Sequence, residues 1–237
     1  MPHSETPKLN FFPASSFKKC NRKEPDFASC VVEAAQTNIP QLTRPFSEVR
    51  LPSLDPLEIP SLVIGSGKAT VAAEQRFHNC KIYGLDKVKV DKFEFDFDRK
   101  NLEVVGRFPE IRKLCDYELN GKILLFNIDS KGPSTIILKN MKATASFDYE
   151  EKQKRAKTFI KFISGNLTLD ADLVSFRFEN VFPGNQAMNE NVNKVMNENW
   201  KTIFTDVNKG YEEAIGQTVR GLLNNFFSKV SFQEAFE

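Results

Sequence analysis

The sequence predicts an α+β fold in which a long C-terminal helix is wrapped by a highly curved antiparallel β-sheet, a super-roll. Two patterns of apolar residues indicate this fold. From about residue 63 to residue 182, apolar and polar residues alternate with the period of two that half-buried strands show. In about the last fifty residues, apolar residues recur at helical spacing instead. Because the helix is apolar over so much of its surface, we expect the sheet to bend round it.

The composition is that of an ordinary globular protein, with 41% hydrophobic and 27% charged residues. No apolar run approaches the roughly 18 residues that cross a bilayer as a helix, so an integral membrane protein is not expected. The 33 basic and 31 acidic residues leave a formal net charge of +2. This balance argues against a dedicated nucleic-acid binder.

Phenylalanine is the unusual component, with 22 residues against four Tyr and one Trp. A buried Phe ring needs no polar partner, so the chain can surround a large apolar volume. Two interpretations stay open on the residues alone. The rings fill a solid core, or the curved sheet leaves an apolar cavity beside the helix.

The first predicted element is a helix that begins near Asp26. Pro25 suits the first turn, and Asp26 places an acid near the positive end of the helix dipole. The helix is expected to end at Ile39-Pro40. The five prolines between residues 40 and 60 then predict an extended, irregular segment that is apolar enough to pack against the rest of the chain.

The predicted strands are long and interrupted by bulges. The inward-facing parity shifts by one residue between Val90 and Phe93, and again between Leu173 and Val174, as a β-bulge would produce. Asn120-Gly121 is a strong hairpin signal and predicts a turn there. Long antiparallel strands with bulges predict a strongly bent sheet.

The C-terminal pattern predicts one helix over residues 188–230, with Asn185 as its N-cap. Such a helix would be ~65 Å long at 1.5 Å per residue. Its apolar arc is roughly 180° wide in the first half and moves round the axis in the second half, well beyond the ~100° stripe of a surface helix. This pattern predicts that the helix is covered on most sides.

The catalytic motifs that the sequence suggests are incomplete. The run Gly65–Thr70 resembles a phosphate-binding loop, but Leu62 and Ala69 occupy positions that the motif reserves for Gly and Ser or Thr, so we interpret the run as a turn. A hydrolase would have to use His78 with Cys80 on the same strand face, and structural roles explain both residues better. No enzyme activity, metal or cofactor is expected.

The cysteines and one glycosylation sequon indicate the cellular compartment of the protein. Four cysteines form an even set, and Asn166-Leu167-Thr168 is a glycosylation sequon that is usable only in the secretory route. The polar start at residues 1–4 shows no signal peptide. The chain is therefore either cytosolic or a mature secreted chain behind an added Met, and we favour the second.

A basic cluster follows the longest alternating run. It consists of Lys152, Lys154, Arg155 and Lys157. A solvated hairpin tip explains the cluster. The alternative is a lipid-transfer module that docks on anionic membranes through this tip.

Several short runs, in this order and spacing, resemble the insect takeout and juvenile-hormone-binding protein family, closer to its takeout branch. Each run alone is weak, but the set covers residues 20–204 and is specific. The runs are Cys20 through Asp26-Phe27 to Cys30; Ile39-Pro40; Leu51-Pro52-Ser53-Leu54-Asp55-Pro56-Leu57; Ile82-Tyr83-Gly84-Leu85; Phe108-Pro109-Glu110-Ile111; Tyr117-Glu118-Leu119-Asn120-Gly121-Lys122-Ile123; Val192-Asn193; and Asn197-Glu198-Asn199-Trp200.

The resemblance implies a helix wrapped by a curved sheet, secretion, and an elongated apolar tunnel. It also implies a Cys20–Cys30 disulfide, whose short loop would contribute about 3 kcal/mol. No cysteines match the second disulfide of the hormone-binding branch, which argues against hormone specificity. Cys80 and Cys115 are candidates for a different second bridge. Residues 1–19 are expected to be a mobile extension, and residues 20–237 a single takeout-like domain.

The function implied is a secreted, non-enzymatic carrier of a small lipophilic ligand such as a juvenile-hormone-like terpenoid, a fatty acid or another isoprenoid. A membrane or receptor is expected only as a transient partner, nucleic acid is not expected, and the chain is expected to be a monomer. The expected ligand-binding residues are Phe27, Val31, Phe93, Phe95, Phe97, Tyr117, Phe147, Tyr149, Trp200, Phe204, Leu222, Leu223 and Phe226. Tyr117 and Tyr149 would orient the polar head of the ligand.

Overall fold

A computed structural model describes residues 18–237 of the chain. The predicted mobile extension over residues 1–19 therefore lies almost entirely outside the described residues. The described part forms four α-helices and seven strands. The helices are α1 (Phe27–Asn38), α2 (Gln186–Glu198), α3 (Trp200–Phe227) and α4 (Phe232–Phe236), and the strands are β1 (Leu57–Ile64), β2 (Val71–Tyr83), β3 (Lys89–Asp96), β4 (Asn101–Ile123), β5 (Phe126–Lys154), β6 (Lys157–Asp170) and β7 (Leu173–Phe178).

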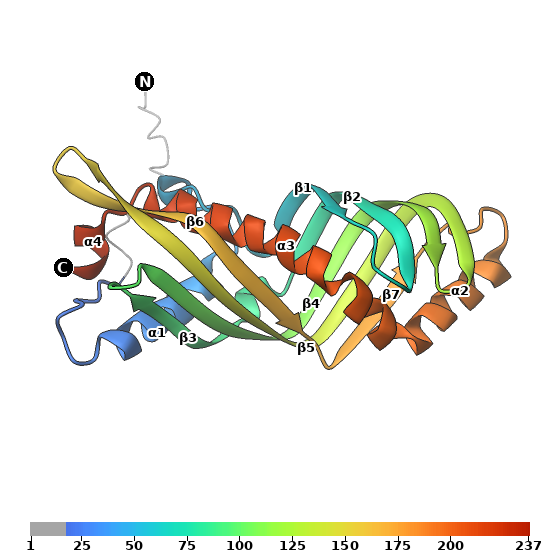
Figure 1. The fold of residues 1–237 in the computed structure, drawn as a ribbon, viewed down its shortest axis with the longest axis horizontal. Coiled ribbons are helices and arrows are strands. Elements are labelled where there is room, and N and C mark those ends of the chain that lie inside the picture. Colours follow the sequence, from blue (N-terminus) through green and yellow to red (C-terminus); the bar gives the residue numbers. More distant parts are fainter. Residues whose placement is uncertain (1–17) are drawn as a thin grey trace, which may run out of the picture.

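The strands form one antiparallel sheet with the order β1-β2-β4-β5-β6, and β3 pairs with β4 while β7 pairs with β5. The molecule is elongated, and α3 runs along the sheet between α2 at one end and α1 and α4 at the other (Figure 1). The predicted α+β fold, a curved antiparallel sheet around a C-terminal helix, is confirmed. No helix within residues 18–237 is long and apolar enough to cross a membrane.

Irregularities in the long strands curve the sheet. The predicted bulge in β3 is confirmed as a register shift between Val90 and Lys92. A second shift in β5 falls between Asp148 and Tyr149. At Pro109, which has no N–H to donate, the inward-facing side of β4 changes from Phe108 to Ile111. These shifts let β4 and β5 bend across the whole molecule.

The turn predicted at Asn120-Gly121 is wrong by a few residues. β4 continues to Ile123, and the hairpin turns at Leu124, which has a left-handed φ of 54°. Gly121 instead lies inside β4 with a φ of 138°, where a Cβ atom would come within 2.3 Å of the Ala72 carbonyl oxygen. The glycine is needed for the close approach of β2 rather than for a turn.

The parity change between Leu173 and Val174 is not a bulge inside one strand. It follows the end of β6 at Asp170, after which the chain enters β7 at Leu173. Both strands pair with β5, at different parts of its length. A change of strand produces the same parity slip in the sequence as a bulge does.

The single long helix predicted over residues 188–230 is also wrong. The helix is interrupted at Asn199, whose φ and ψ of −111° and 21° are not helical and whose side chain donates to the Val195 carbonyl at 2.8 Å. The C-terminal segment is therefore two helices, α2 and α3, that meet at Asn199. One face of α3 remains exposed, and the sheet covers the other.

Asparagine side chains of α2 and α3 cover the open edges of the sheet. Asn193 binds both the N–H and the C=O of Phe178, each at 2.8 Å. Asn197 does the same for Phe176 in β7 (2.8 Å each), and Asn224 does so for Phe162 in β6 at 2.8 and 3.0 Å. Unpaired edges promote association with other chains, so these amides act in place of a further strand.

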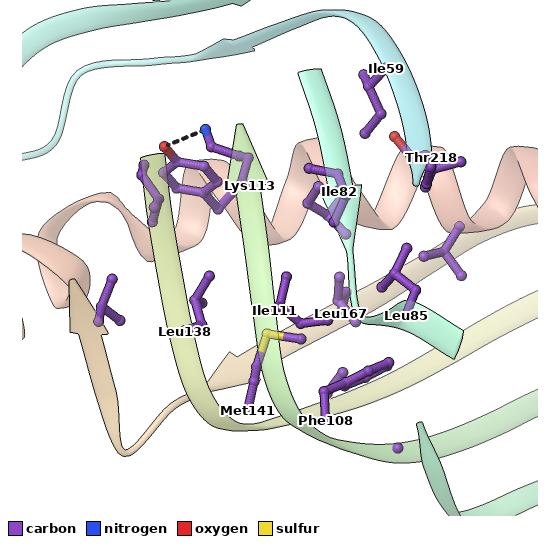
Figure 2. A pocket seen from close by; sticks show the side chains of 18 of the residues that line it. Ile59, Ile82, Leu85, Phe108, Ile111, Lys113, Leu138, Met141, Leu167 and Thr218 are labelled. Carbon is purple, nitrogen blue, oxygen red and sulfur yellow. Dashed lines mark hydrogen bonds between the residues drawn. The ribbon is translucent and has the colours of Figure 1, made fainter. Parts of the chain in front are cut away.

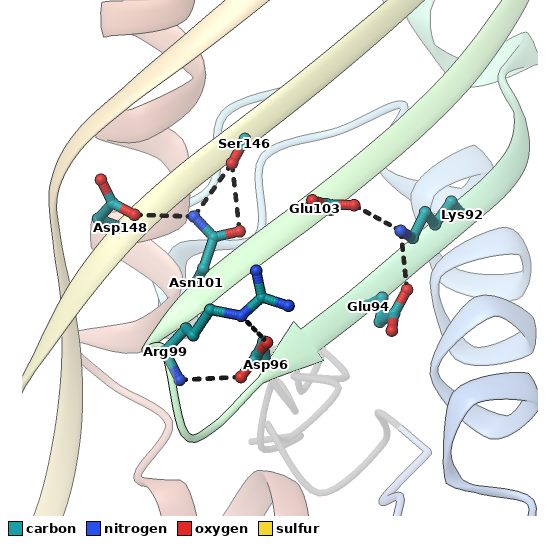
Figure 3. A network of polar contacts seen from close by, with 8 residues as sticks. All are labelled: Lys92, Glu94, Asp96, Arg99, Asn101, Glu103, Ser146 and Asp148. Atoms are coloured by element: carbon teal, nitrogen blue, oxygen red, sulfur yellow. Dashed lines mark hydrogen bonds and ion pairs between the residues drawn. The ribbon is translucent and has the colours of Figure 1, made fainter.

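The outer face of the sheet is polar. Lys92 pairs with Glu94 at 2.8 Å and with Glu103, while Asn101 donates to Ser146 at 3.0 Å and to Asp148 at 2.8 Å (Figure 3). These residues alternate with buried apolar ones on the same strands. The buried apolar side chains of these strands therefore lie on the opposite, inner face of the sheet.

Candidate ligand-binding cavities between the sheet and helix α3

A cavity of about 350 Å³ lies between the sheet and α3, and we call it the inner cavity. Figure 2 shows its wall, with Ile82, Ile111 and Leu138 from three different strands facing the same space. Helix α3 contributes side chains three or four residues apart, which form one stripe along its length. The stripe includes Ile203, Val207, Tyr211, Ile215, Thr218 and Leu222.

The inner cavity is mostly apolar, and its wall residues are buried or half-buried. Among the described residues of its wall, four carry polar side-chain groups: Gln75, Lys113, Tyr211 and Thr218. The Thr218 hydroxyl donates to the Ala214 carbonyl of its own helix, which leaves three polar groups for a ligand.

A second space of about 430 Å³, the outer cavity, lies between α1, the C-terminal part of α3 and α4. Its rim carries the exposed side chains of Lys18, Lys19, Lys229 and Glu234. The two cavities adjoin, because six residues line both. These are Ile39, Leu54, Phe93, Val219, Leu222 and Leu223.

The three remaining polar groups of the inner cavity form a cluster that we call the polar triad: Lys113 of β4, Gln75 of β2 and Tyr211 of α3. Lys113 and Gln75 are only 5% and 6% exposed. The Lys113 amine donates to the Tyr211 hydroxyl at 3.4 Å (Figure 2), and that hydroxyl donates to the Gln75 Oε1 at 3.4 Å. The Gln75 Nε2 atom has no hydrogen-bond partner among the described residues.

No acidic side chain compensates Lys113 within the described wall of the inner cavity. Its Nζ atom lies 3.1 Å from the centroid of the Phe77 ring and 5.0 Å from that of Tyr211, contacts that favour a cation. Burial nevertheless moves the pKa of Lys113 well below its usual value, and it raises the pKa of Tyr211. The triad therefore favours uncharged side chains when the cavity is empty.

The end of the molecule near α4 also contains a group of packed rings, three of which line the outer cavity. Six phenylalanines have ring centroids 4.8–6.3 Å from their neighbours, mostly in tilted or edge-on contacts. We call this group the aromatic cluster. It consists of Phe27, Phe95, Phe97, Phe227, Phe232 and Phe236.

Comparison with known proteins identifies the family. Residues 5–237 match the family described as haemolymph juvenile hormone binding protein (JHBP). The chain belongs to this family. The Drosophila yakuba "Circadian clock-controlled protein daywake" is 25% identical over 231 residues (94% of this chain and 88% of that protein), and its Drosophila melanogaster counterpart is 24% identical over the same shares.

Takeout 1 of Epiphyas postvittana has the same fold as this JHBP-family chain. The crystal structure aligns with a TM-score of 0.80 at 23% identity, covering 92% of this chain and 99% of Takeout 1. The family resemblance read from the sequence motifs is thus confirmed, as is the takeout-like fold.

Within this JHBP-family fold, eight of the thirteen residues expected to bind ligand line a cavity. Phe147 and Phe204 line the inner cavity. Phe93, Leu222 and Leu223 line both cavities, and Val31, Phe95 and Phe226 line the outer one.

The other five expected residues line neither cavity. Phe27 and Phe97 belong to the aromatic cluster, and Trp200 is half-buried at the start of α3. The Tyr117 hydroxyl donates a hydrogen bond to the Glu179 carbonyl at 2.6 Å, so it does not reach a ligand. Tyr149 packs between Phe95 and Phe162, where burial raises its pKa to about 12.

The sequence reasoning missed all three members of the polar triad. For one of them, Lys113, the sequence pattern did indicate an unusual position. Lys113 follows Ile111 and precedes Cys115 at the same parity, so it occupies an inward position of an apolar strand face. A lysine at such a position is rarely buried without a reason.

Both cysteine pairs are bonded. The implied Cys20–Cys30 disulfide is present, and Cys80 and Cys115 form a second bridge between β2 and β4. Because Cys80 is in a disulfide, it has no thiol to act as the nucleophile of the hydrolase considered above. Asn166 of the sequon is exposed on β6.

The basic cluster lies at the turn between β5 and β6, where Arg155 and Ala156 both have left-handed φ values. Two of its four charges are compensated. Lys152 pairs with Glu150 at 3.2 Å, and Lys157 pairs with Glu234 at 2.8 Å.

The run Gly65–Thr70, which resembles a phosphate-binding loop, forms the turn between β1 and β2. Its backbone binds a carboxylate side chain of the same protein. The Asp206 carboxylate of α3 accepts from the backbone N–H groups of residues 68–71 at 2.7–3.3 Å. Desolvation opposes the charge of Asp206, but the hydrogen bonds from this turn outweigh it and lower its pKa. The turn therefore fixes the hairpin to α3 and is not free to hold phosphate.

Proposed function

We propose that the protein is a secreted, non-enzymatic carrier that encloses a small lipophilic ligand in the inner cavity. The observation that carries the proposal is the mostly apolar space of about 350 Å³ between the sheet and α3. Cavities of this size and character are typical of small-molecule sites. The ligand would contact Phe93, Phe147, Phe204, Leu222 and Leu223.

Burial of the ligand from water supplies the affinity. A ligand of about fifteen carbons gains ~12 kcal/mol at ~0.8 kcal/mol per CH₂ group. Association and ordering remove several kcal/mol, which leaves roughly micromolar binding. The ligand classes that suit such walls are a juvenile-hormone-like terpenoid, a fatty acid or another isoprenoid. The family description, which names juvenile hormone, supports this range.

Secretion is supported by the covalent chemistry of the chain. Both disulfides need an oxidising compartment to persist. The exposed Asn166 is accessible for glycosylation in the same route.

Direct docking on membranes through the basic cluster is less well supported as a function. Ion pairs compensate Lys152 and Lys157, so two of the four charges are available for anionic lipid. The cavity accounts for a lipophilic ligand without this contact.

The proposal is tested by filling the inner cavity. Ala143 lines the cavity from β5, and its neighbour Thr144 points to solvent. Fluorescence titration with N-phenyl-1-naphthylamine should show binding to the wild type, and binding at least about ten-fold weaker to Ala143→Phe. The matched control Thr144→Phe should bind as the wild type does. Equal affinity of all three proteins would show that the probe does not use the inner cavity.

A further inference from the structure

We propose that the polar triad of Lys113, Gln75 and Tyr211 anchors a carboxylate, so that the ligand of the inner cavity is a lipophilic carboxylic acid. This inference rests on the proposed carrier function and names the chemical class of its ligand.

The triad has more donors than acceptors. A charged Lys113 offers three N–H donors and no acceptor, and its contact with the Tyr211 hydroxyl is long at 3.4 Å. The Gln75 amide nitrogen offers two more N–H donors, and neither has a partner among the described residues. The acceptors present are the Gln75 Oε1 and the Tyr211 hydroxyl, which already bind one another. A ligand that completes the triad must therefore bring acceptor atoms.

A carboxylate suits this site better than a neutral group. It brings two oxygen atoms and the negative charge that the described wall of the inner cavity lacks. An ester or alcohol oxygen can accept a hydrogen bond but brings no charge to pair with an ammonium, and a buried unpaired ammonium is costly, so Lys113 stays a neutral amine beside it. Hydrogen bonds between two charged groups are also about twice as strong as neutral ones.

Binding should be coupled to a proton. Lys113 and Tyr211 are the titratable groups among the described residues of the inner wall, and burial favours the uncharged form of both. When an ionised acid, R–COO⁻, enters beside the neutral amine, Lys113 takes up one proton from solvent, which gives R–COO⁻ paired with the Lys113 ammonium. No proton is taken up when an uncharged ester binds.

The approach to the triad also favours an acid. Lys18, Lys19 and Lys229 stand at the rim of the outer cavity, although Lys18 pairs with Glu33. From Tyr211 the apolar stripe of α3 continues for eleven residues, ~16 Å, to Leu222, which both cavities share. An acyl chain anchored at the triad thus has an apolar path toward the outer cavity.

The test uses lauric acid and its methyl ester on the full chain at pH 8, with isothermal titration calorimetry in two buffers of different ionisation enthalpy. The wild type should bind laurate at least about ten-fold more tightly than methyl laurate, with uptake of about one proton for laurate and none for the ester. Lys113→Met should lose this preference and the proton uptake while binding the ester unchanged. Gln75→Leu should weaken the binding of laurate about three-fold.

Lys122→Met is the control, because Lys122 is exposed on the same strand. It should behave as the wild type. Lys113→Met should unfold at no lower urea concentration than the wild type, since a buried unpaired amine is replaced by an apolar chain of similar size. Both ligands binding with equal affinity, laurate binding without proton uptake, or an unchanged preference in Lys113→Met would overturn the anchor and leave the carrier function intact. Failure of both probes to bind the wild type would instead overturn the carrier function.

Discussion

The aromatic cluster and the inner cavity are both formed by apolar side chains, but these side chains are densely packed in the cluster and leave open space in the cavity. In the aromatic cluster, rings from α1, β3, α3 and α4 fill the space with centroids as close as 4.8 Å. In the inner cavity, mostly aliphatic side chains from the curved sheet and one stripe of α3 leave about 350 Å³ open. Large flat rings pack against one another at one end of the molecule, beside the outer cavity, while the curvature of the long strands keeps the sheet away from α3 in the middle.

This difference shows that phenylalanine content does not locate a cavity. Phe95 and Phe97 were both expected as tunnel walls, yet both pack in the aromatic cluster, and of the two Phe95 alone also lines the outer cavity. The short α4, which follows α3, supplies two of the rings of this cluster.

The largest expected difference between the two regions is in stability. Phe232 is 5% exposed and contacts Phe97 and Phe236, so Phe232→Ala should lower the free energy of unfolding by about 3–5 kcal/mol. Leu138 faces the inner cavity and has fewer atoms to lose, so Leu138→Ala should cost less than about 2 kcal/mol. Urea denaturation measures both. Equal losses would mean that the two regions are packed alike.

A smaller effect is expected where the two cavities adjoin. Leu222→Trp would fill this point, since Leu222 lines both cavities. Palmitic acid should then bind about ten-fold more weakly, because its chain must extend past residue 222, while the shorter octanoic acid should be affected less than three-fold. Competition titrations with both acids check this. The same loss for both chain lengths would argue against a path between the cavities.

The smallest expected change in stability comes from the Glu234 carboxylate, which helps to hold α4 in place. Lys157 and the Ser231 cap hold the Glu234 carboxylate and lower its pKa to about 2. A lowered pKa stabilises the fold fully above about pH 4.5, and this contribution is lost as the pH falls toward 2. Glu234→Gln should therefore cost about 1 kcal/mol at pH 7, and the difference from the wild type should disappear near pH 2.

Glu213→Gln, at an exposed position of α3, is the control for this pH series and should follow the wild type throughout. Denaturation at several pH values supplies the measurement. A loss that stays constant down to pH 2 would assign the effect of Glu234 to packing instead of charge.

Much of the fold could be predicted from local patterns. Alternation gave the strands, the shift between Val90 and Phe93 marked a real bulge, and Pro25 and Ile39-Pro40 bracketed α1. Features set by distant contacts could not be predicted. Asn199 interrupts the C-terminal helix, and Gly121 serves the close approach of β2.

The candidate site was less predictable than the fold. Alternation shows which side chains face inward but not whether the facing layer fills the space, so Tyr117 and Phe147 looked alike although of the two only Phe147 lines the inner cavity. The polar triad joins residues of β2, β4 and α3 that are up to 136 positions apart. Only the fold brings Gln75 and Tyr211 together.

The most direct test of the account is a crystal structure of the protein with ω-bromolauric acid, located by the anomalous signal of bromine. The account predicts the carboxylate beside Lys113 and the bromine inside the protein, between the sheet and α3 toward Leu222. Bromine found only on the outer surface, or an inner cavity filled by its own side chains, would contradict it.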